Sequence, residues 1–583
     1  MLRPHSYACI IILLLCSFGC GGSGSSVPVT RPPTVSLAVS PALVTPGQES
    51  TLTWSSTDAD ACGASGAWSG PQQTSGSQKV SQVAVGDYVY KLECTGAGGS
   101  ESASGSLSIT TLSVSADASQ RGPAMNSDQL GTNVNIGSTD ISDPAFISLW
   151  KGAGIGLFRY PGGLLSDYYH WKTHSYGSCS PFPNPPAETS FDTWMQAVAQ
   201  PMKANVAVTV NYGTNATCTG PGDPNEAADW VDYANNIQHY GIKYWTVGNE
   251  DYLAGEPDLN VTPHDPSTYA SRVSSEFYPS MKAKDPTIQV GIDLAFGNLT
   301  FDTGLDTWDP IVLANASYDF VELHYYPEHN NLDDDAALLT RWADQAATNF
   351  STAKSLLAAS SHPNTPMFLG EFDRDSGGSA GPPGHENVSI VNALFSAIVI
   401  GEATNAGVKM TAAWTAVDLC WPDSLSSPIS TAYGKQNFGS FGLFAGSGSG
   451  FSFSCVDQAV PKGTPFPKAR AFQLLQQYVK GGEAPIAITS SDQSVRVYAA
   501  TSGNGYSLLF VNTDSATSHT LPVTIQNATK ASFTATSMVY GKTEYDLSAA
   551  GDWAEPTSSQ MGTVGSTFDI SLPPWSLTLV KLQ

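Results

Sequence analysis

The sequence predicts a multidomain protein with a (β/α)8 TIM barrel at its centre and a β-sandwich before and after it. Three observations support this prediction. The chain has 583 residues, and at roughly 100 to 200 residues per domain this is enough for three or four domains. Residues 112–466 alternate short apolar runs with amphipathic helical stretches, which is the pattern of repeated βα units. Residues 31–111 and 467–583 contain short alternating strands separated by Gly, Pro and Ser, so we expect a sandwich in each.

The first twenty residues resemble a secretion signal of the lipoprotein type. Arg3 and His5 precede an apolar run over residues 8–15, which is shorter than the roughly 20 residues that a membrane-spanning helix needs. Cys20 follows this run, and the Gly- and Ser-rich residues 21–30 have the composition of a flexible linker. We therefore expect residues 1–20 to be the signal, Cys20 to be lipidated, and the protein to be an outer-membrane or cell-surface lipoprotein. The alternative is plain cleavage and secretion.

The charge of the chain excludes some partners. Lys and Arg number 26 against 51 Asp and Glu, which gives a net charge of −25. This charge repels phosphate backbones and anionic lipids, so we expect no nucleic acid as a partner, and membrane contact only through a lipid at Cys20. A polysaccharide or oligosaccharide fits this surface better.

Residues 31–111 are predicted to form a small sandwich. Alternating runs occupy residues 36–40, 50–55 and 86–94, as in a half-buried strand. Trp54, Cys62 and Cys94 together resemble a bacterial immunoglobulin-like module. The resemblance implies a spacer or a weak glycan-binding module without chemistry of its own.

Six cysteines remain after the signal, and an even number in an exported protein indicates disulfides. Because sequential pairing keeps each pair inside one predicted domain, we expect that pairing. No Cys-x-x-Cys spacing indicates a structural metal, and we expect neither a metal nor another cofactor. The expected pairs are Cys62 with Cys94, Cys179 with Cys218, and Cys420 with Cys455.

The central region contains eight predicted strands and helices between them. No Gly-x-Gly-x-x-Gly follows the first strand, which disfavours the alternative, an open doubly wound sheet. The strands are expected at residues 130–136, 155–160, 206–211, 244–250, 288–293, 320–324, 367–371 and 410–414. Helices are expected at residues 193–203, 225–239, 267–284, 334–358 and 388–405. After the barrel, a helix at 469–479 should lead into strands at 495–500, 506–511, 520–525 and 576–582.

Two of the predicted barrel strands end in glutamate, Glu250 on the fourth and Glu371 on the seventh. The reactive side chains of a barrel lie at the C-terminal ends of its strands. Two carboxyl groups facing each other there are what cleavage of a glycosidic bond requires, one as a proton donor and the other as a nucleophile. In enzymes that retain the anomeric configuration the two groups lie about 5 Å apart.

Four motifs then follow the predicted strands in order: Arg-Tyr-Pro-Gly-Gly at 159–163, Gly-Asn-Glu at 248–250, His-Tyr-Tyr at 324–326 and Gly-Glu at 370–371. This set resembles the clan A retaining glycoside hydrolases, and most of all the α-L-arabinofuranosidases, over residues 112–583. The resemblance implies that Glu250 is the acid/base and Glu371 the nucleophile. It also implies supporting roles: Asn249 binds the sugar 2-hydroxyl, Arg159 and Tyr326 keep Glu371 ionised, His324 lies near Glu250 or the sugar, and Trp414 stacks on the sugar ring.

The sequence leaves the substrate open. It departs from the arabinofuranosidase pattern at Leu164 and Leu165, which follow Pro-Gly-Gly, and at Phe372, which follows Glu371. An exo-acting α-L-arabinofuranosidase is the first expectation, and an endo-glycanase, xylosidase or β-glucuronidase of the same clan is the alternative. A surface lipoprotein that binds glycans without cleaving them is a third. Glu322 lies two residues before His324, and we expect it deeper in the barrel with a structural role.

Overall fold

The computed structural model describes residues 31–296, 307–327, 335–374, 376, 389–418, 421–422, 438–439, 441–447, 455, 460–549 and 554–583. The predicted signal, the linker, Cys20 and Cys420 fall outside these residues. The chain divides into two compact units, residues 1–112 and 113–583. Within the described parts of the chain, no helix is long and apolar enough to cross a membrane.

The first unit consists of two antiparallel-rich sheets, as expected for residues 31–111. One sheet has the order β1-β3-β6 and the other β2-β8-β7-β4-β5. Trp54, Trp68 and Tyr90 pack in its core beside the Cys62–Cys94 disulfide, which joins register partners on two neighbouring strands. The strands are β1 (Thr34–Ser40), β2 (Leu43–Val44), β3 (Glu49–Thr57), β4 (Ala61–Gly66), β5 (Gly70–Gln72), β6 (Ser75–Ser81), β7 (Gly86–Gly96) and β8 (Gly99–Ile109).

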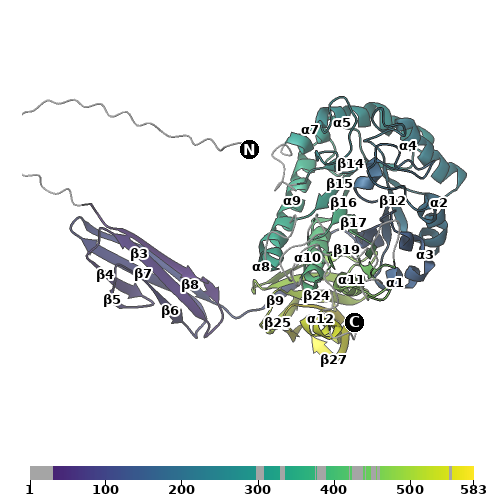
Figure 1. Ribbon diagram of the computed structural model, residues 1–583. Coiled ribbons are helices and arrows are strands. Elements are labelled where there is room, and N and C mark those ends of the chain that lie inside the picture. Colours follow the sequence, from purple (N-terminus) through teal and green to yellow (C-terminus); the bar gives the residue numbers. More distant parts are fainter. Residues whose placement is uncertain are drawn as a thin grey trace, which may run out of the picture. The chain divides into compact units, whose positions relative to one another are not determined.

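The second unit contains the predicted barrel, closed by eight parallel strands in chain order (Figure 1). All eight predicted strands are confirmed. They are buried on both faces, which explains their continuous apolar runs. The strands are β10 (Gly131–Asn133), β11 (Leu157–Tyr160), β12 (Asn205–Val210), β13 (Tyr244–Val247), β14 (Gln289–Leu294), β15 (Phe320–Tyr325), β16 (Met367–Phe372) and β17 (Met410–Ala413).

Helices surround the barrel at the predicted places. Several of them include a wider π-helical segment, over Met195–Ala199, Asp232–Ile237, Val273–Phe277 and Leu338–Trp342. Asp223 and Asp265 cap the helices that follow them, each with a proline at the first helical position. The helices are α1 (Ile147–Gly152), α2 (Phe191–Trp194), α3 (Gln200–Met202), α4 (Pro224–Val231), α5 (Pro266–Arg272), α6 (Tyr278–Lys284), α7 (Trp308–Asn315), α8 (Asp335–Ala337), α9 (Ala343–Ala359) and α10 (Ile390–Ala406).

A nine-stranded, sandwich-like sheet follows the barrel, with the order β27-β26-β29-β24-β23-β22-β9-β25-β28. Helix α11 (Pro467–Tyr478) lies between this sheet and the barrel (Figure 1), and α10 is buried almost all round because α9, α11 and the sheet cover it. The strands are β22 (Pro485–Ser490), β23 (Val495–Ser502), β24 (Gly505–Asn512), β25 (His519–Gln526), β26 (Ser532–Gly541), β27 (Thr557–Gly565), β28 (Thr567–Leu572) and β29 (Ser576–Leu582), with α12 (Lys542–Ala549) between β26 and β27.

Strand β9 (Val114–Arg121) corrects one predicted boundary. Residues 112–466 were expected to form the barrel, but β9 pairs with β22 and β25 and so belongs to the C-terminal sheet. Its alternation of buried and partly exposed residues is that of a strand with one covered face. A pattern of this kind shows the presence of a strand, and it does not show which distant strand will pair with it.

Candidate active site

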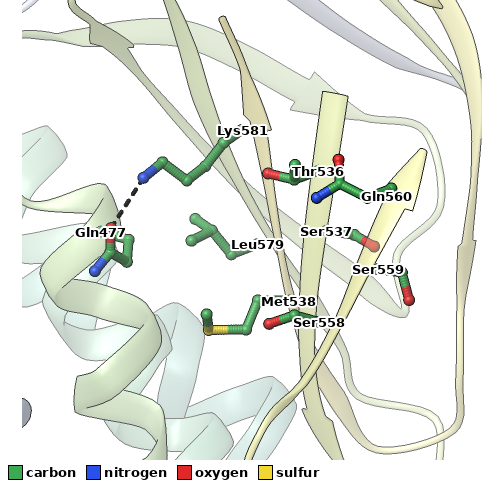
Figure 2. Close-up of a pocket in the computed structure, with 9 residues that line it drawn as sticks. All are labelled: Gln477, Thr536, Ser537, Met538, Ser558, Ser559, Gln560, Leu579 and Lys581. Atoms are coloured by element: carbon green, nitrogen blue, oxygen red, sulfur yellow. Dashed lines mark hydrogen bonds between the residues drawn. The ribbon is translucent and has the colours of Figure 1, made fainter. Parts of the chain in front are cut away.

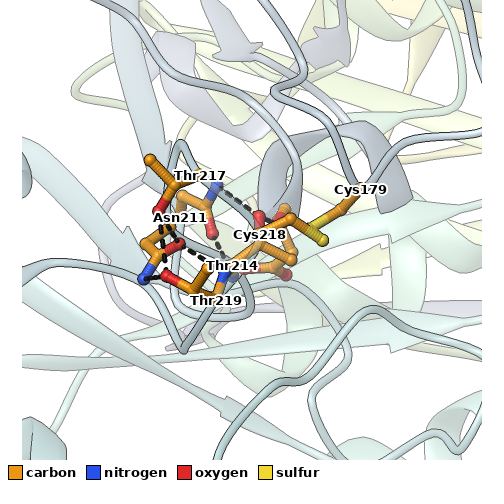
Figure 3. The surroundings of a disulfide bond; sticks show 8 residues. Cys179, Asn211, Thr214, Thr217, Cys218 and Thr219 are labelled. Carbon is orange, nitrogen blue, oxygen red and sulfur yellow. Dashed lines mark hydrogen bonds between the residues drawn. A yellow bond between two sulfur atoms is a disulfide. The ribbon is translucent and has the colours of Figure 1, made fainter.

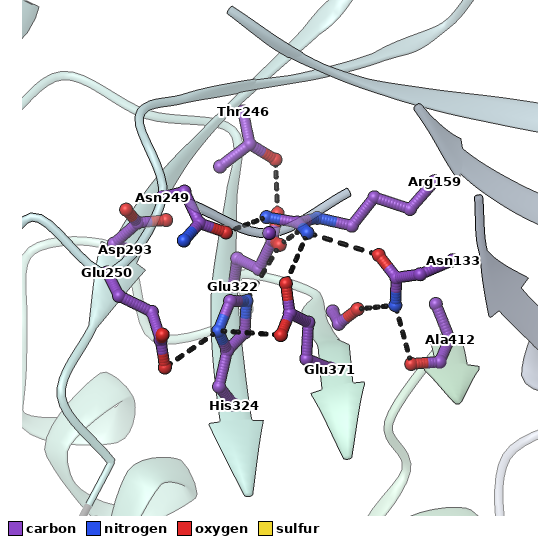
Figure 4. Close-up of polar contacts among 12 residues, drawn as sticks. Asn133, Arg159, Thr246, Asn249, Glu250, Asp293, Glu322, His324, Glu371 and Ala412 are labelled. Atoms are coloured by element: carbon purple, nitrogen blue, oxygen red, sulfur yellow. Dashed lines mark hydrogen bonds and ion pairs between the residues drawn. The ribbon is translucent and has the colours of Figure 1, made fainter. Parts of the chain in front are cut away.

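Six of the seven predicted site residues meet in one polar network at the C-terminal ends of the barrel strands. Figure 4 labels all of them except Tyr326. Arg159 comes from β11, and Asn249 and Glu250 from the turn after β13. His324 and Tyr326 come from β15 and the position just after it, and Glu371 from β16. The seventh, Trp414, directly follows β17. The closed barrel is what brings these residues together from distant parts of the chain.

Arg159 is the centre of this network and is fully buried. Its Nε lies 2.6 Å from Oε1 of Glu322, and its Nη1 lies 2.7 Å from Oε1 of Glu371. Nη1 also donates to Asn133, and Nη2 donates to Oδ1 of Asn249 at 2.8 Å. One guanidinium therefore fixes the candidate nucleophile relative to the Gly-Asn-Glu turn. Arginine suits this role because its N–H donors form a rigid planar fork.

His324 lies between the two candidate catalytic glutamates. Its Nδ1 is 3.1 Å from Oε1 of Glu250 and 3.9 Å from Oε2 of Glu371, so these two oxygens are at most about 7 Å apart. Its Nε2 lies 3.2 Å from Oε1 of Glu322. Because both ring nitrogens face carboxylates, the geometry suits an imidazolium with a proton on each.

The backbone turn that carries Glu250 needs glycine at one position. Gly248 has φ 82°, and a Cβ on it would come within 1.7 Å of the Asp251 carboxylate. Glu250 itself has φ 50°, a left-handed conformation that is unfavourable for a side chain of this kind. The side chain of Asp167 stabilises the turn, since its Oδ2 accepts from the backbone N–H of Asn249 at 2.8 Å and its Oδ1 from that of Tyr212.

Trp414 lies against the Pro-Gly-Gly turn and is partly exposed. A Cβ on Gly162 would come within 2.8 Å of the indole, and one on Gly163 within 2.6 Å. The two glycines therefore leave the space that the ring occupies. An indole fixed at the edge of a carboxylate site has the shape of a stacking surface for a sugar ring.

The electrostatics of the site depend on the charge of His324. Burial alone would lower the pKa of His324, but Glu371 and Glu250 raise it well above its ordinary value. Burial would raise the pKa of Glu250, but the charge of His324 and hydrogen bonds from His324 and Tyr252 hold it below its ordinary value. Burial raises the pKa of Glu371, and the nearby His324 and Arg159 only partly offset this. These shifts favour a proton on His324 over a proton on Glu250.

Several residues of the network were not predicted from the sequence. Asn133 ends β10 and accepts from Arg159, so its position at the end of a strand was a usable signal. Tyr252 donates to Glu250 at 3.1 Å, and Thr246 donates to Glu322. Asp167 lies in a loop where no sequence pattern marks it. Glu322 is fully buried beneath the site, as expected.

A disulfide joins two loops of the barrel mouth. Cys179, in the loop after β11, is bonded to Cys218, in the loop after β12 (Figure 3). Asn211 and Thr214 stabilise the second loop, since the backbone N–H of Thr214 donates to Oδ1 of Asn211. The first two predicted pairings are therefore confirmed. Cys455 is buried and disulfide-bonded, and its expected partner Cys420 lies outside the described residues.

A second concave site lies away from the barrel mouth, between α11 and the C-terminal sheet (Figure 2). It has a volume of about 370 Å³ and is lined by hydroxyl and amide side chains, by Leu579 and Met538, and by Lys581, whose Nζ donates to Gln477 at 2.9 Å. No carboxylate lines it, so it lacks the pair of carboxyl groups that cleavage of a glycosidic bond requires. Over the described ranges, no cluster of three or more His, Cys, Asp or Glu side chains is arranged to hold a metal ion.

Together the fold and the network define a (β/α)8 barrel with carboxylates at the ends of its fourth and seventh strands. No family model and no curated protein matches the sequence. Solved structures match over 81% of this chain. A GH51 arabinofuranosidase from Xanthomonas axonopodis pv. citri does so with a TM-score of 0.59, at 14% identity and over 100% of its own chain.

Two further structures agree. The α-L-arabinofuranosidase from Thermotoga maritima, in complex with arabinose, matches with a TM-score of 0.58, at 16% identity and over 99% of its chain. A family 44 endoglucanase from Clostridium thermocellum matches with a TM-score of 0.52, at 13% identity and over 100% of its chain. The chain therefore has the fold shared by families 51 and 44.

Proposed function

We propose that this protein is a retaining glycoside hydrolase whose acid/base is Glu250 and whose nucleophile is Glu371. The observation that carries the proposal is the contact of both carboxylates with a single nitrogen of His324, at 3.1 and 3.9 Å. Their spacing of at most about 7 Å includes the retaining geometry and lies below most of the range of inverting enzymes.

The reaction proceeds by two displacements at the anomeric carbon. First, Glu371 attacks this carbon while the bond to the leaving oxygen breaks and Glu250 protonates that oxygen. A water molecule, deprotonated by Glu250, then displaces Glu371 from the sugar. Arg159 and Tyr326 stabilise the negative charge of Glu371 before the attack and again when the ester is cleaved.

The acid proton is shared between Glu250 and His324. In the free protein it lies on Nδ1 of His324, 3.1 Å from Oε1 of Glu250. It moves across this contact to Glu250 and on to the leaving oxygen, and the proton taken from water in the second step restores it. The pair therefore holds one proton more in the free protein than in the glycosyl-enzyme.

The substrate we propose is a terminal α-L-arabinofuranosyl residue of a plant or microbial polysaccharide. The fold likeness to arabinofuranosidases and the disulfide-tied loop beside the site, which suits a pocket closed on one side, support this choice. An endo-acting glucanase or xylanase is the second candidate, because structures with those activities in their names share the fold at TM-scores of 0.52 and 0.54.

The decisive experiment combines a panel of aryl glycosides with three variants. Arabinofuranoside, xyloside, glucoside and glucuronide substrates identify the sugar. We expect Glu371→Ala to be inactive on all of them. Glu250→Ala should keep activity only on substrates with acidic leaving groups, and azide should rescue it with retention of configuration. Glu276→Ala, which removes a carboxylate that is 43% exposed on the outside of the barrel, is the control and should be fully active. Rescue of Glu371→Ala with retention would reverse the two roles.

We also propose that the protein is exported and carries a lipid on Cys20. The charged start, the short apolar run and the Gly- and Ser-rich linker support this. Labelled palmitate should enter the full-length protein and not the Cys20→Ala variant. Release of the unlabelled wild type into the medium would indicate plain secretion instead.

A further inference from the structure

A buried lysine of the C-terminal part of the chain reaches into the barrel mouth. Lys468 is the second residue of α11, and its side chain is fully buried. Its Nζ lies 2.5 Å from Oδ2 of Asp373 and donates to the backbone oxygens of Trp414 at 2.6 Å and Phe441 at 2.5 Å. An ammonium group has three N–H donors, so each one has an acceptor.

The three acceptors belong to three segments that shape the candidate site. Asp373 lies two residues after the candidate nucleophile on the same segment as β16. Trp414 directly follows β17 and provides the indole at the edge of the site. The centre of the Phe441 ring lies 6.5 Å from the centre of that indole. One side chain from outside the barrel therefore holds the nucleophile strand and the indole in a fixed relation.

We propose that Lys468, together with Asp373, is a positioning residue that orients Trp414 relative to Glu371, so that helix α11 is part of the active-site framework. This inference rests on the proposed function for the role of Trp414 in binding a sugar ring. The indole of Trp414 packs against Gly162 and Gly163 on one side. The backbone N–H of Trp414 donates to the carbonyl of Phe372 at 3.1 Å. The bond from Lys468 to the carbonyl of Trp414 fixes the next peptide unit, so the backbone of Trp414 is held on both sides of its Cα.

The chemistry of the lysine explains why a different residue would not serve. Methionine has the same length but no donor, so the backbone oxygen of Trp414 and Oδ2 of Asp373 would each lose the hydrogen bond from Lys468 in a buried place. Arginine offers a planar fork, which cannot place three bonds around one nitrogen. Burial raises the pKa of Asp373 to about 6, although the charge of Lys468 opposes this, and Asn392 also donates to its Oδ1 at 2.5 Å.

A double-mutant cycle separates positioning from a merely structural role. We expect Lys468→Met to lower kcat/KM by about tenfold to a hundredfold when Trp414 is present. In a Trp414→Ala background the same change should cost less than about threefold, because the ring it positions is gone. Equal losses in both backgrounds would overturn the proposal. Asp373→Asn, which keeps an acceptor for Lys468, is the milder second variant if Lys468→Met folds poorly.

The matched control is Lys282→Met. Lys282 also forms a partly buried ion pair, 2.7 Å from Asp319, but Asp319 directly precedes β15 and therefore lies at the opposite end of the barrel. We expect Lys282→Met to lower thermal stability and to leave kcat/KM unchanged in both backgrounds.

A measurement without substrate keeps the inference separate from the proposed function. The backbone N–H of Thr415 donates to Phe441 at 2.9 Å, and that of Leu443 donates to Thr415 at 2.9 Å. Hydrogen exchange at these two amides should be faster in Lys468→Met than in the wild type, and unchanged in Lys282→Met. If exchange at these amides does not change, Lys468 does not fix this segment and the proposal fails. If exchange changes but the wild type cleaves no glycoside, the proposed function fails and the positioning of Trp414 stands.

Discussion

Tyr326→Phe is the sharpest test of how the site controls the ionisation of Glu371. The hydroxyl of Tyr326 donates to Oε2 of Glu371 at 2.8 Å, and the tyrosine is buried. Removing it leaves the ring in place and deletes one hydrogen bond to a charged group, which contributes about 1.5 to 3 kcal/mol. Since about 1.4 kcal/mol corresponds to one pKa unit, we expect the pKa of Glu371 to rise by roughly one to two units.

The assay is the pH dependence of kcat/KM on an aryl glycoside. The acid limb reports protonation of the nucleophile in the free enzyme, so this limb should move to higher pH by roughly one to two units in Tyr326→Phe. The matched control is Tyr325→Phe, because the hydroxyl of that neighbouring buried residue donates to the backbone of Trp342 at 2.6 Å and not to Glu371. Its acid limb should not move. A lower activity of Tyr326→Phe with an unmoved acid limb would show that Tyr326 contacts the substrate instead, and would refute the reasoning.

Three further outcomes are expected. Replacement of His324 by Asn should move the alkaline limb of the same profile to lower pH, because the acid proton is then held by Glu250 alone. If the alkaline limb does not move, His324 and Glu250 do not share the proton. Burial raises the pKa of Asp167 to about 7 and of Asp309 to about 6, above the ordinary 3.8. Between pH 8 and 5 the folded state therefore binds protons that the unfolded state does not bind. The free energy of unfolding, measured by urea titration, should rise by roughly 2 to 4 kcal/mol as the pH falls over this range. A decrease in the free energy of unfolding would contradict the raised pKa values of these two aspartates. The Cys179–Cys218 disulfide joins loops rather than strands. Its reduction should therefore lower activity at temperatures where far-ultraviolet circular dichroism still shows a folded barrel. Loss of activity and of the circular dichroism signal at the same temperature would contradict this prediction.

The barrel could be predicted from the sequence because its signals are local. Each strand is a short apolar run, and the glutamates and the Arg-Tyr-Pro-Gly-Gly motif stand at strand ends, where a barrel gathers its reactive groups. The closure of the barrel then brings Arg159, Glu250, His324 and Glu371 together, so no long-range contact has to be predicted for them. Six of the seven predicted site residues lie in one network for this reason.

The rest could not be predicted because it depends on distant contacts. Asp167 accepts hydrogen bonds from backbone N–H groups of two other loops. It could not be predicted from the sequence because a carboxylate in a loop is usually exposed to solvent. Lys468 looks like any polar residue in the first turn of a helix, and only the packing of α11 on the barrel makes it buried. The lowered pKa of Glu250 also depends on a distant contact, because His324 comes from another strand of the barrel.

Strand β9 has a consequence for the synthesis of the chain. The backbone N–H of Ser113, just before β9, donates to Ser491, which lies 378 positions later. At about 5 to 20 residues per second, a ribosome needs roughly 20 to 75 seconds to make the intervening chain. During that time β9, with Val114, Ala116 and Ala118 on its apolar face, has no neighbouring strand. A nascent chain of this protein therefore exposes an unpaired strand until its last hundred or so residues emerge, and it depends on chaperones over that interval more than a chain whose strands pair in order.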